Sequence, residues 1–297
     1  MRSLTRILVI SGLIPHDAGK TWFTLGLVEA MWRFGLNIAI YKPVAAHNLW
    51  FSPRTLVKSA ELKLLVGNDI LAYYERGVLR DVTRSNPVAL GLAPRDPFTT
   101  SSLDEYLESF EDPLKMLVLA RFTECSSRVI KHLVVRENLE KTPPLVRSSI
   151  EDLARTLNSI ESSIEEVLDY LRSEILTRNL NLCLEELSSS VDLIIVESFN
   201  DAVIPYTSLL DKLNTLILVT PGRILLYSES DQLKSTISNN LTNLGEEGCR
   251  ASYLVKQVKP TRVFSSRLQL EPGVTETHLE LARIISSLVR ARSAEIT

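Results

Sequence analysis

The sequence lacks any run of about 20 consecutive apolar residues, the length that a membrane-spanning helix needs. We therefore expect no membrane span. It also lacks an excess of charge of either sign, because 33 Lys and Arg stand against 36 Asp and Glu, for a net charge of −3. Nucleic acid and anionic membrane surfaces are therefore not expected to be the main partners.

Cysteines are few, and Cys125, Cys183 and Cys249 are odd in number and far apart. This spacing predicts neither a disulfide framework nor a zinc site, and it favours small buried side chains in a reducing compartment. The four histidines are too dispersed for a metal cluster. The first apolar stretch is short and is not followed by a small-residue cleavage site, so we expect a cytoplasmic protein.

Short apolar runs alternate with segments of helical spacing along most of the chain. The runs that read as buried parallel strands are Arg6–Ser11, Asn37–Tyr41, Val191–Glu197, Thr215–Thr220 and Ala251–Val255. The main helical segments between and after them are Trp22–Phe34, Arg54–Val66, Asp69–Arg76, Glu161–Ser188, Tyr227–Asn243 and Glu276–Arg292. This alternation predicts an α/β fold with a mostly parallel sheet and helices on both faces.

The first strand leads into a loop that ends in Gly19-Lys20-Thr21, and a helix follows. This is the layout of a phosphate-binding loop, in which N–H groups at a helix start and the helix dipole attract an anion. Lys20 is expected to reach the β- and γ-phosphates, and the Thr21 hydroxyl to help hold Mg²⁺. The usual glycine five residues before Gly19 is replaced by Ile14, and the nearest upstream glycine is Gly12. An ordinary strand–turn–helix with a solvent-facing lysine is the alternative.

The residues expected around the nucleotide belong to this loop and to the start of the helix: Gly12, Asp17, Ala18, Gly19, Lys20, Thr21 and Trp22. Asp17 has two interpretations. It either contacts a bound lysine or water, or it shapes the loop through bonds to nearby N–H groups.

Tyr41-Lys42-Pro43-Val44-Ala45 follows the second predicted strand. Together with the opening loop, this stretch resembles dethiobiotin synthetase and related P-loop NTPases, the branch that includes cobyrinic acid amide synthases and MinD-like ATPases. The resemblance implies a three-layer P-loop NTPase sandwich that uses ATP and Mg²⁺. It also implies that Lys42 is a second cation at the γ-phosphate, the alternative being an exposed lysine at a strand end.

Two acidic residues are candidate metal contacts in addition to Thr21. The strand Val191–Glu197 ends in Glu197, and an acidic residue at the end of a buried strand suits the far contact of nucleotide-bound Mg²⁺. By the resemblance, Asp69 at a helix start has the place of an aspartate that helps bind Mg²⁺. A simple helix cap is the equal alternative for Asp69.

Two further residues are assigned from their positions after predicted strands. His47 lies just beyond Lys42 and is a candidate to orient an acceptor or to transfer a proton, the alternative being a structural histidine. Gln257 follows the last predicted strand, where the relatives read the base. The segment Lys256–Pro260 has no aspartate to pair with guanine, which favours adenine and makes Gln257 a candidate base contact. Alternatively, Gln257 caps the strand in solvent.

The chain departs from its relatives after Glu197. They continue with Gly-Ala-Gly-Gly, whereas this chain has Ser198-Phe199-Asn200-Asp201. We therefore expect a related ATPase rather than dethiobiotin synthetase itself. The predicted function is Mg²⁺-dependent ATP hydrolysis or γ-phosphoryl transfer to a small acceptor of unknown identity, as a kinase or as a ligase that activates a carboxylate or carbamate.

Two other functions are weighed against this one. The first is a MinD-like ATP-dependent switch, which is disfavoured because Gly12–Ala18 contains no lysine to reach across a dimer. The second is a polynucleotide 5′-hydroxyl kinase, because some of these enzymes have loops like Asp17-Ala18-Gly19-Lys20. The near-neutral charge and the absence of an aromatic–basic stripe argue against it.

Residues 80–148 interrupt the strand–helix alternation. Prolines punctuate the segment, and two β-type runs lie at Leu117–Phe122 and His132–Arg136. We therefore predict a nucleotide-binding domain over 1–79 and 149–297, with 80–148 as an insertion that forms a small subdomain. The long helical stretch Glu161–Ser188 also suits packing against a second copy, so a homodimer is a further prediction.

Overall fold

The computed structural model describes residues 5–79 and 81–294. The fold is α/β, with two mixed sheets in which most strands run parallel to a neighbour. The chain divides into two compact units: unit 1 comprises Met1–Pro43, Tyr73–Asp81 and Leu184–Thr297, and unit 2 comprises Val44–Ala72 and Val82–Cys183. Unit 2 thus extends on both sides of the segment 80–148, because strands from residues 44–48 and 160–162 join its sheet.

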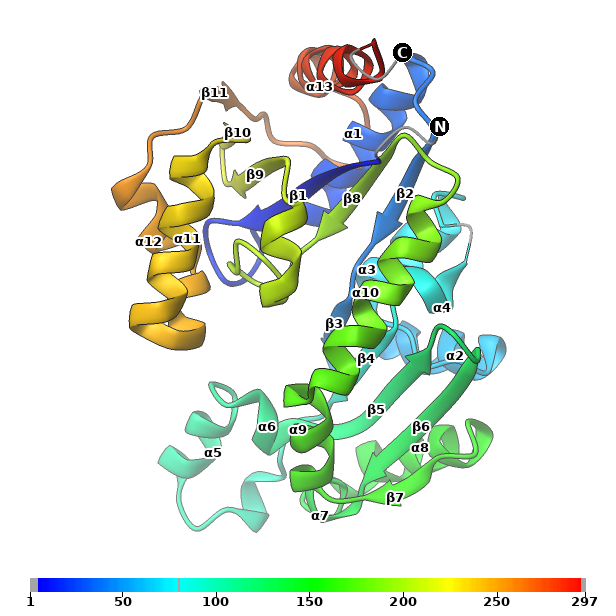
Figure 1. Cartoon of the computed structure of the whole chain (residues 1–297). Coiled ribbons are helices and arrows are strands. Elements are labelled where there is room, and N and C mark those ends of the chain that lie inside the picture. Colours follow the sequence, from blue (N-terminus) through cyan, green and yellow to red (C-terminus); the bar gives the residue numbers. More distant parts are fainter. Residues whose placement is uncertain (1–4, 80, 295–297) are drawn as a thin grey trace. The chain divides into compact units, whose positions relative to one another are not determined.

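Unit 1 is built on a six-stranded sheet in the order β11-β10-β9-β1-β8-β2 (Figure 1). Its strands are β1 (Arg6–Gly12), β2 (Ile38–Tyr41), β8 (Leu193–Glu197), β9 (Thr215–Thr220), β10 (Arg223–Ser228) and β11 (Arg262–Ser265). The first four run parallel, as predicted, and β10 and β11 are antiparallel additions at one edge. The parallel strands are continuous apolar runs because they are buried on both faces.

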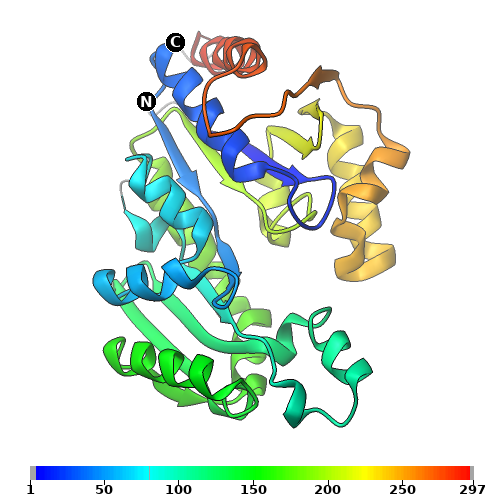
Figure 2. The same ribbon diagram turned by 180° about the vertical axis from the view of Figure 1, so that it is seen from behind.

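The helices of unit 1 are α1 (Lys20–Arg33), α11 (Asp231–Leu244), α12 (Ala251–Gln257) and α13 (Glu276–Ala294), with the 3₁₀ turns η2 (Thr207–Lys212) and η3 (Gly245–Cys249). The helices α3 (Asn68–Glu75) and α10 (Glu174–Ser188) begin in unit 2 and end in unit 1. Helices α1 and α13 pack side by side, and α1 crosses the face of the sheet that is turned to the viewer in Figure 2. Because β1, β2 and β8 are parallel, their carboxyl ends share one edge of the sheet, where ligands bind in such folds.

The predicted strand Ala251–Val255 is wrong, because these residues form most of helix α12. Ala251, Leu254 and Val258 are buried, which is a spacing of three to four residues. A short apolar run has no periodicity of its own that separates a strand from a buried helix.

The predicted helix Tyr227–Asn243 starts too early. Tyr227 belongs to β10, and the helix α11 begins at Asp231 after the capping residue Ser230. The turn Thr220-Pro221-Gly222 reverses the chain into this extra strand, and Gly222 has a φ of 77°, which favours glycine. This tight turn therefore joins the antiparallel strands β9 and β10.

Unit 2 has a five-stranded sheet in the order β3-β4-β5-β6-β7. Its strands are β3 (Val44–Asn48), β4 (Val88–Leu92), β5 (Leu117–Glu124), β6 (Val129–Val135) and β7 (Ile160–Ser162). The two β-type runs predicted for 80–148 are confirmed, since they form the antiparallel pair β5–β6. The outer pairs β3–β4 and β6–β7 are parallel.

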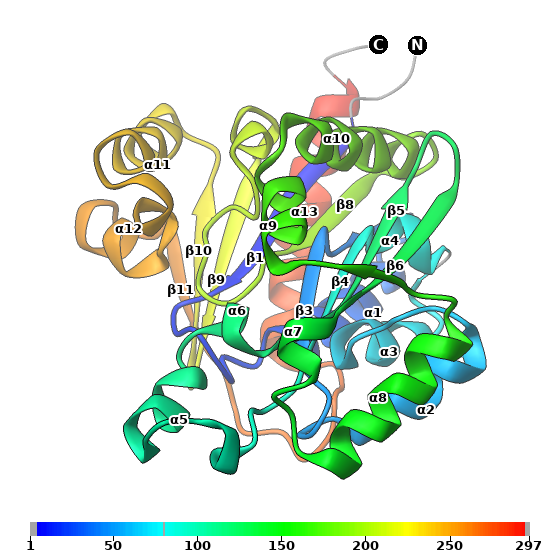
Figure 3. The ribbon, with the colours of Figure 1, turned by 90° about the horizontal axis from the view of Figure 1, so that it is seen from below.

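The helices of unit 2 are α2 (Pro53–Leu62), α4 (Val82–Ser85), α5 (Leu103–Ser109), α6 (Pro113–Met116), α7 (Arg136–Leu139), α8 (Pro144–Thr156) and α9 (Ile164–Arg172), with the 3₁₀ turn η1 (Pro97–Thr99). Helices α2 and α8 lie next to each other (Figure 3). Leu49, Leu65, Leu119, Ile150 and Leu153 belong to one buried core cluster in this unit. Among residues 5–79 and 81–294, none of the helices combines the length and the apolar character needed to span a bilayer.

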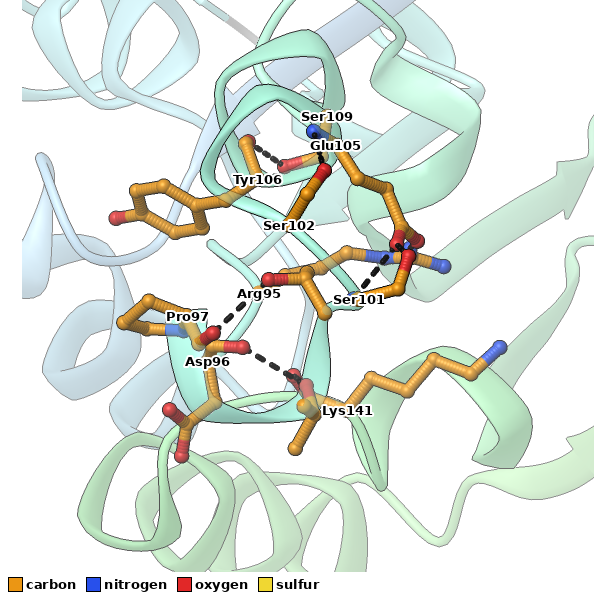
Figure 4. A network of polar contacts seen from close by, with 11 residues as sticks. Arg95, Asp96, Pro97, Ser101, Ser102, Glu105, Tyr106, Ser109 and Lys141 are labelled. Atoms are coloured by element: carbon orange, nitrogen blue, oxygen red, sulfur yellow. Dashed lines mark hydrogen bonds and ion pairs between the residues drawn. The ribbon is translucent and has the colours of Figure 1, made fainter.

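A polar network holds the segment around α5, as Figure 4 shows. Ser102 caps the helix by accepting from the Glu105 N–H, and the Glu105 carboxylate accepts from the N–H and hydroxyl of Ser101. The two bonds from Ser101, with the Arg95 guanidinium 3.2 Å away, hold the pKa of the Glu105 carboxyl below its ordinary value. The Asp96 N–H donates to the Lys141 carbonyl at 2.7 Å, which fixes the start of the segment.

The cysteine prediction is also wrong, because Cys125 and Cys183 form a disulfide within unit 2. Cys125 follows β5 and Cys183 lies on α10, with their Cα atoms 5.4 Å apart. The Asn179 side chain reinforces this junction by accepting from the Cys125 N–H and donating to the Thr123 carbonyl. Cys249 is a free thiol whose pKa burial raises to about 11.

Replacing both bonded cysteines by alanine is expected to lower the free energy of unfolding by about 2–4 kcal/mol, because the bridge closes a long loop in the unfolded chain. The bonded residues are 58 positions apart. Urea unfolding of wild type, of Cys125→Ala/Cys183→Ala and of the control Cys249→Ala checks this. A thiol titration that finds three free cysteines in the unreduced, denatured protein would contradict the disulfide itself.

Candidate functional site

The loop between β1 and α1 turns sharply before the helix begins. Gly19 stands at the N-terminus of α1 with a φ of 84°, and Asp17 is exposed with a φ of 53°. The first helical backbone bond runs from the Phe23 N–H to the Gly19 carbonyl at 3.0 Å. The first turn holds no acidic residue and no side chain caps it, so its positive dipole end is not opposed by a carboxylate of the same turn.

Gly12, the last residue of β1, lies in close contact with the loop that follows it. A Cβ at this position would lie 2.6 Å from the Ile14 carbonyl oxygen and 3.0 Å from both the Ala18 Cβ and the Asn200 carbonyl oxygen. The loop therefore folds back over the last residue of β1, and Ala18 is buried beneath it. Only glycine fits without a shift of backbone atoms.

The Lys20 side chain points to the segment that follows β8. Its Nζ donates to the Asn200 carbonyl at 2.7 Å, and the Gly12 N–H donates to the same oxygen at 3.3 Å. Asn200 has a φ of 45°, a left-handed conformation that asparagine tolerates better than most residues. The segment after β8 and the loop after β1 are thus joined through one carbonyl.

Glu197, at the carboxyl end of β8, is fully buried. The Lys42 ammonium donates to Glu197 Oε1 at 2.5 Å, and the Thr21 hydroxyl donates to the same oxygen at 3.4 Å. The Tyr73 hydroxyl donates to Oε2. Three elements therefore deliver donors to one buried carboxylate.

The strand register explains this meeting. Tyr41 of β2 lies opposite Val196 of β8, so Lys42 after β2 is next to Glu197. Glu197 also lies opposite Ile10 of β1, close to where the chain turns into α1 and Thr21. Lys42 is itself buried, with 3% of its surface exposed, which rejects the interpretation of an exposed strand-end lysine.

His47 and Asp69 belong to unit 2. His47 is buried in β3, and burial lowers its pKa to about 4, although the Asp69 charge acts in the opposite direction. Neither ring nitrogen of His47 makes a hydrogen bond of normal geometry in the described part of the chain. Asp69 is partly exposed in the first turn of α3. Their predicted roles in catalysis and metal binding stay predictions.

Gln257 is not at the end of a strand, because α12 replaces the strand from which its role was inferred. Its side-chain amide donates to Asn240 Oδ1 on α11 at 2.9 Å. Trp22 in the first turn of α1 is 43% exposed. We do not carry Gln257 into the site.

The donor chemistry of Thr21 and Glu197 suits a hard cation, since both offer oxygen. Among residues 5–79 and 81–294, no group of three or more His, Cys, Asp and Glu side chains is arranged to hold a metal ion. Mg²⁺ characteristically takes one or two protein oxygens and completes its shell with water and substrate phosphates. The residues present therefore fit a nucleotide-bound Mg²⁺ better than a permanent metal centre.

Two contributors to this site have no signal in the sequence. Tyr73 is separated from Glu197 by 124 positions and lies in a segment of ordinary helical pattern. Asn200 contributes its carbonyl, which side-chain patterns do not reveal. Comparison of the chain with protein-family models, curated proteins and solved structures gave no match.

Proposed function

We propose that unit 1 is a P-loop NTPase domain that binds ATP with Mg²⁺ and transfers the γ-phosphoryl group to a small acceptor or to water. The observation that carries this proposal is the meeting of Thr21, Lys42 and Glu197 beside the first turn of α1. Lys20 extends from the same turn. Phosphoryl transfer depends on positioning and on neutralising charge, so a group of cations, hydroxyl and carboxylate next to helix amides suits it.

Each residue has a defined part in this proposal. The amides of Gly19, Lys20 and Thr21 bind phosphate oxygens at the positive end of α1. Lys20 exchanges the Asn200 carbonyl for the β- and γ-phosphates, since a charged acceptor gives the stronger bond. Lys42 exchanges Glu197 for the γ-phosphate.

Mg²⁺, when bound, neutralises charge on the phosphates. Thr21, whose hydroxyl lies 3.4 Å from Glu197 Oε1, would hold the metal together with the Glu197 carboxylate. The acceptor, the choice between kinase and ligase chemistry, and the homodimer stay predictions from the sequence.

Saturating ATP·Mg²⁺ is expected to raise the melting temperature, because a ligand that binds the folded state alone stabilises it by about 2.7 kcal/mol at 100 times its Kd. Lys20→Ala should abolish the rise, since it removes the cation at the start of α1. Differential scanning fluorimetry with ATP, ADP and no nucleotide checks this. Lys259→Ala, an exposed lysine of unit 1, is the matched control and should respond as wild type does.

Equal melting temperatures with and without ATP·Mg²⁺ in the wild type would reject the proposal. Where binding is found, ADP release in the presence of a panel of small acceptors distinguishes transfer from hydrolysis. An acceptor of the reaction raises ADP release above the rate in buffer, whereas hydrolysis alone gives one rate for every compound.

A further inference from the structure

Tyr73 and the other donors to Glu197 bind different oxygens of its carboxylate. The Tyr73 hydroxyl donates to Oε2, whereas Lys42 and Thr21 both donate to Oε1. Tyr73 and Glu197 are both 0% exposed. The two oxygens of the carboxylate therefore have different surroundings, one facing Tyr73 and the other facing the start of α1.

Nucleotide binding is expected to change the contacts of Oε1 but not the contact of Oε2. Under the proposed function, Lys42 turns to the γ-phosphate and Thr21 to the metal, so the partners of Oε1 change. Tyr73, which donates to Oε2, is assigned no contact with the nucleotide or the metal. The terminal torsion of a glutamate is soft, so a carboxylate held at Oε1 alone is free to rotate once those partners leave. A bond between a hydroxyl and a carboxylate is charge-assisted and strong enough to fix the plane.

We infer that Tyr73 is a positioning residue, which holds Glu197 by Oε2 so that Oε1 stays directed at the metal beside Thr21. This inference rests on the proposed function. It assigns Tyr73 no contact with substrate, because Tyr73 acts through Glu197. Supporting hydroxyls of this kind around metal contacts change metal affinity by about 10–100-fold when they are removed.

The test is Tyr73→Phe, which keeps the ring and removes the hydroxyl. Binding of a fluorescent ATP analogue is measured in a titration with Mg²⁺ and again in EDTA. The apparent Kd for Mg²⁺ is expected to rise at least tenfold, and nucleotide affinity in EDTA to change less than about twofold. The control is Tyr227→Phe, the same change at a buried tyrosine on β10 whose hydroxyl has no partner in the described residues. It should match wild type in both conditions.

A double-mutant cycle separates positioning from a general loss of structure. Glu197→Gln weakens the metal contact by itself, and adding Tyr73→Phe to it should give no further loss of Mg²⁺ affinity, because the hydroxyl acts through the carboxylate. Losses that multiply would overturn the inference. So would an equal loss of binding with Mg²⁺ and in EDTA, which is what a merely structural hydroxyl produces.

The failure of this inference is distinct from that of the proposed function. If wild type binds nucleotide in a Mg²⁺-dependent way and Tyr73→Phe does the same, Tyr73 has no positioning role and the function stands. If wild type does not bind nucleotide at all, the function falls, and the inference falls with it.

Discussion

Between pH 7 and pH 5 the free energy of unfolding is expected to fall by roughly 6 kcal/mol, because three histidines are buried uncharged. Burial is the main cause that lowers the pKa of His47, His132 and His278 to about 4 in each case. All three residues are buried, with at most 7% of their surface exposed. A histidine whose pKa is about 6.5 in the unfolded chain and about 4 in the folded chain lowers the free energy of unfolding by roughly 2 kcal/mol at pH 5.

The direction of the effect follows from where the protons bind. The unfolded chain takes up a proton on each of these histidines below about pH 6.5, whereas the folded chain takes them up only near pH 4. Between these values the unfolded state holds more protons, so stability falls as the pH falls.

The hydrogen bonds of two of the rings agree with this. His132 Nε2 accepts from the Leu65 N–H at 3.2 Å, and His278 Nδ1 accepts from the Thr275 N–H at 3.0 Å. Both nitrogens must be unprotonated to accept. For His47, burial and the Arg121 charge both oppose protonation, and burial, the largest cause, outweighs the Asp69 charge that favours it.

Urea unfolding at pH 7, 6 and 5 measures the fall. In His278→Gln the fall should be about 2 kcal/mol smaller, since one of the three titrating groups is gone and glutamine still offers an acceptor. His16→Gln, in the exposed loop before α1, is the control and should fall as wild type does. A free energy of unfolding that is constant from pH 7 to pH 5 would contradict the prediction.

The central strands could be predicted from the sequence because burial on both faces makes them continuous apolar runs, as in β1 and β8. The antiparallel strand β10 was missed because it mixes buried with partly or fully exposed residues, so its end was assigned to the helix that follows it. The disulfide was missed for another reason. Cys125 and Cys183 are brought together by tertiary folding across 58 positions, and no local spacing signals it.

The candidate site divides in the same way. Thr21, Lys42 and Glu197 each stand at a helix start or a strand end, so local pattern and parallel topology place them at one edge of the sheet. Tyr73 lies on helix α3, whose sequence pattern predicts that Tyr73 is buried but not that it contacts Glu197. The register between β2 and β8, which sets Lys42 against Glu197, is a tertiary fact that the sequence does not state.

Lys42→Met is expected to lower the free energy of unfolding by about 3–5 kcal/mol, because it removes the cation from a fully buried carboxylate. Glu197 would keep the hydroxyls of Tyr73 and Thr21, which are uncharged donors. Methionine preserves most of the volume of the lysine stem, so the loss reports the charge rather than a cavity. Urea unfolding at pH 7 measures it.

The matched control is Lys58→Met. Lys58 pairs with Glu61 at 2.6 Å, close to the 2.5 Å of the buried pair. The side chains of Lys58 and Glu61 are 34% and 54% exposed, however. A surface pair of this kind contributes about 0–1 kcal/mol. The same substitution at similar ionic geometry therefore separates the effect of burial from the effect of pairing.

Adding Glu197→Leu to Lys42→Met should restore much of the lost stability, because a buried ion pair replaced by apolar side chains is often neutral in free energy. The restoration is incomplete, since the buried Tyr73 hydroxyl loses its acceptor at about 1–3 kcal/mol. The double variant should nevertheless fail to gain stability from ATP·Mg²⁺, because both groups belong to the proposed site. A double variant that folds well and gains no stability from ATP·Mg²⁺ would show that this pair is maintained for binding rather than for stability. A double variant less stable than Lys42→Met would contradict the argument.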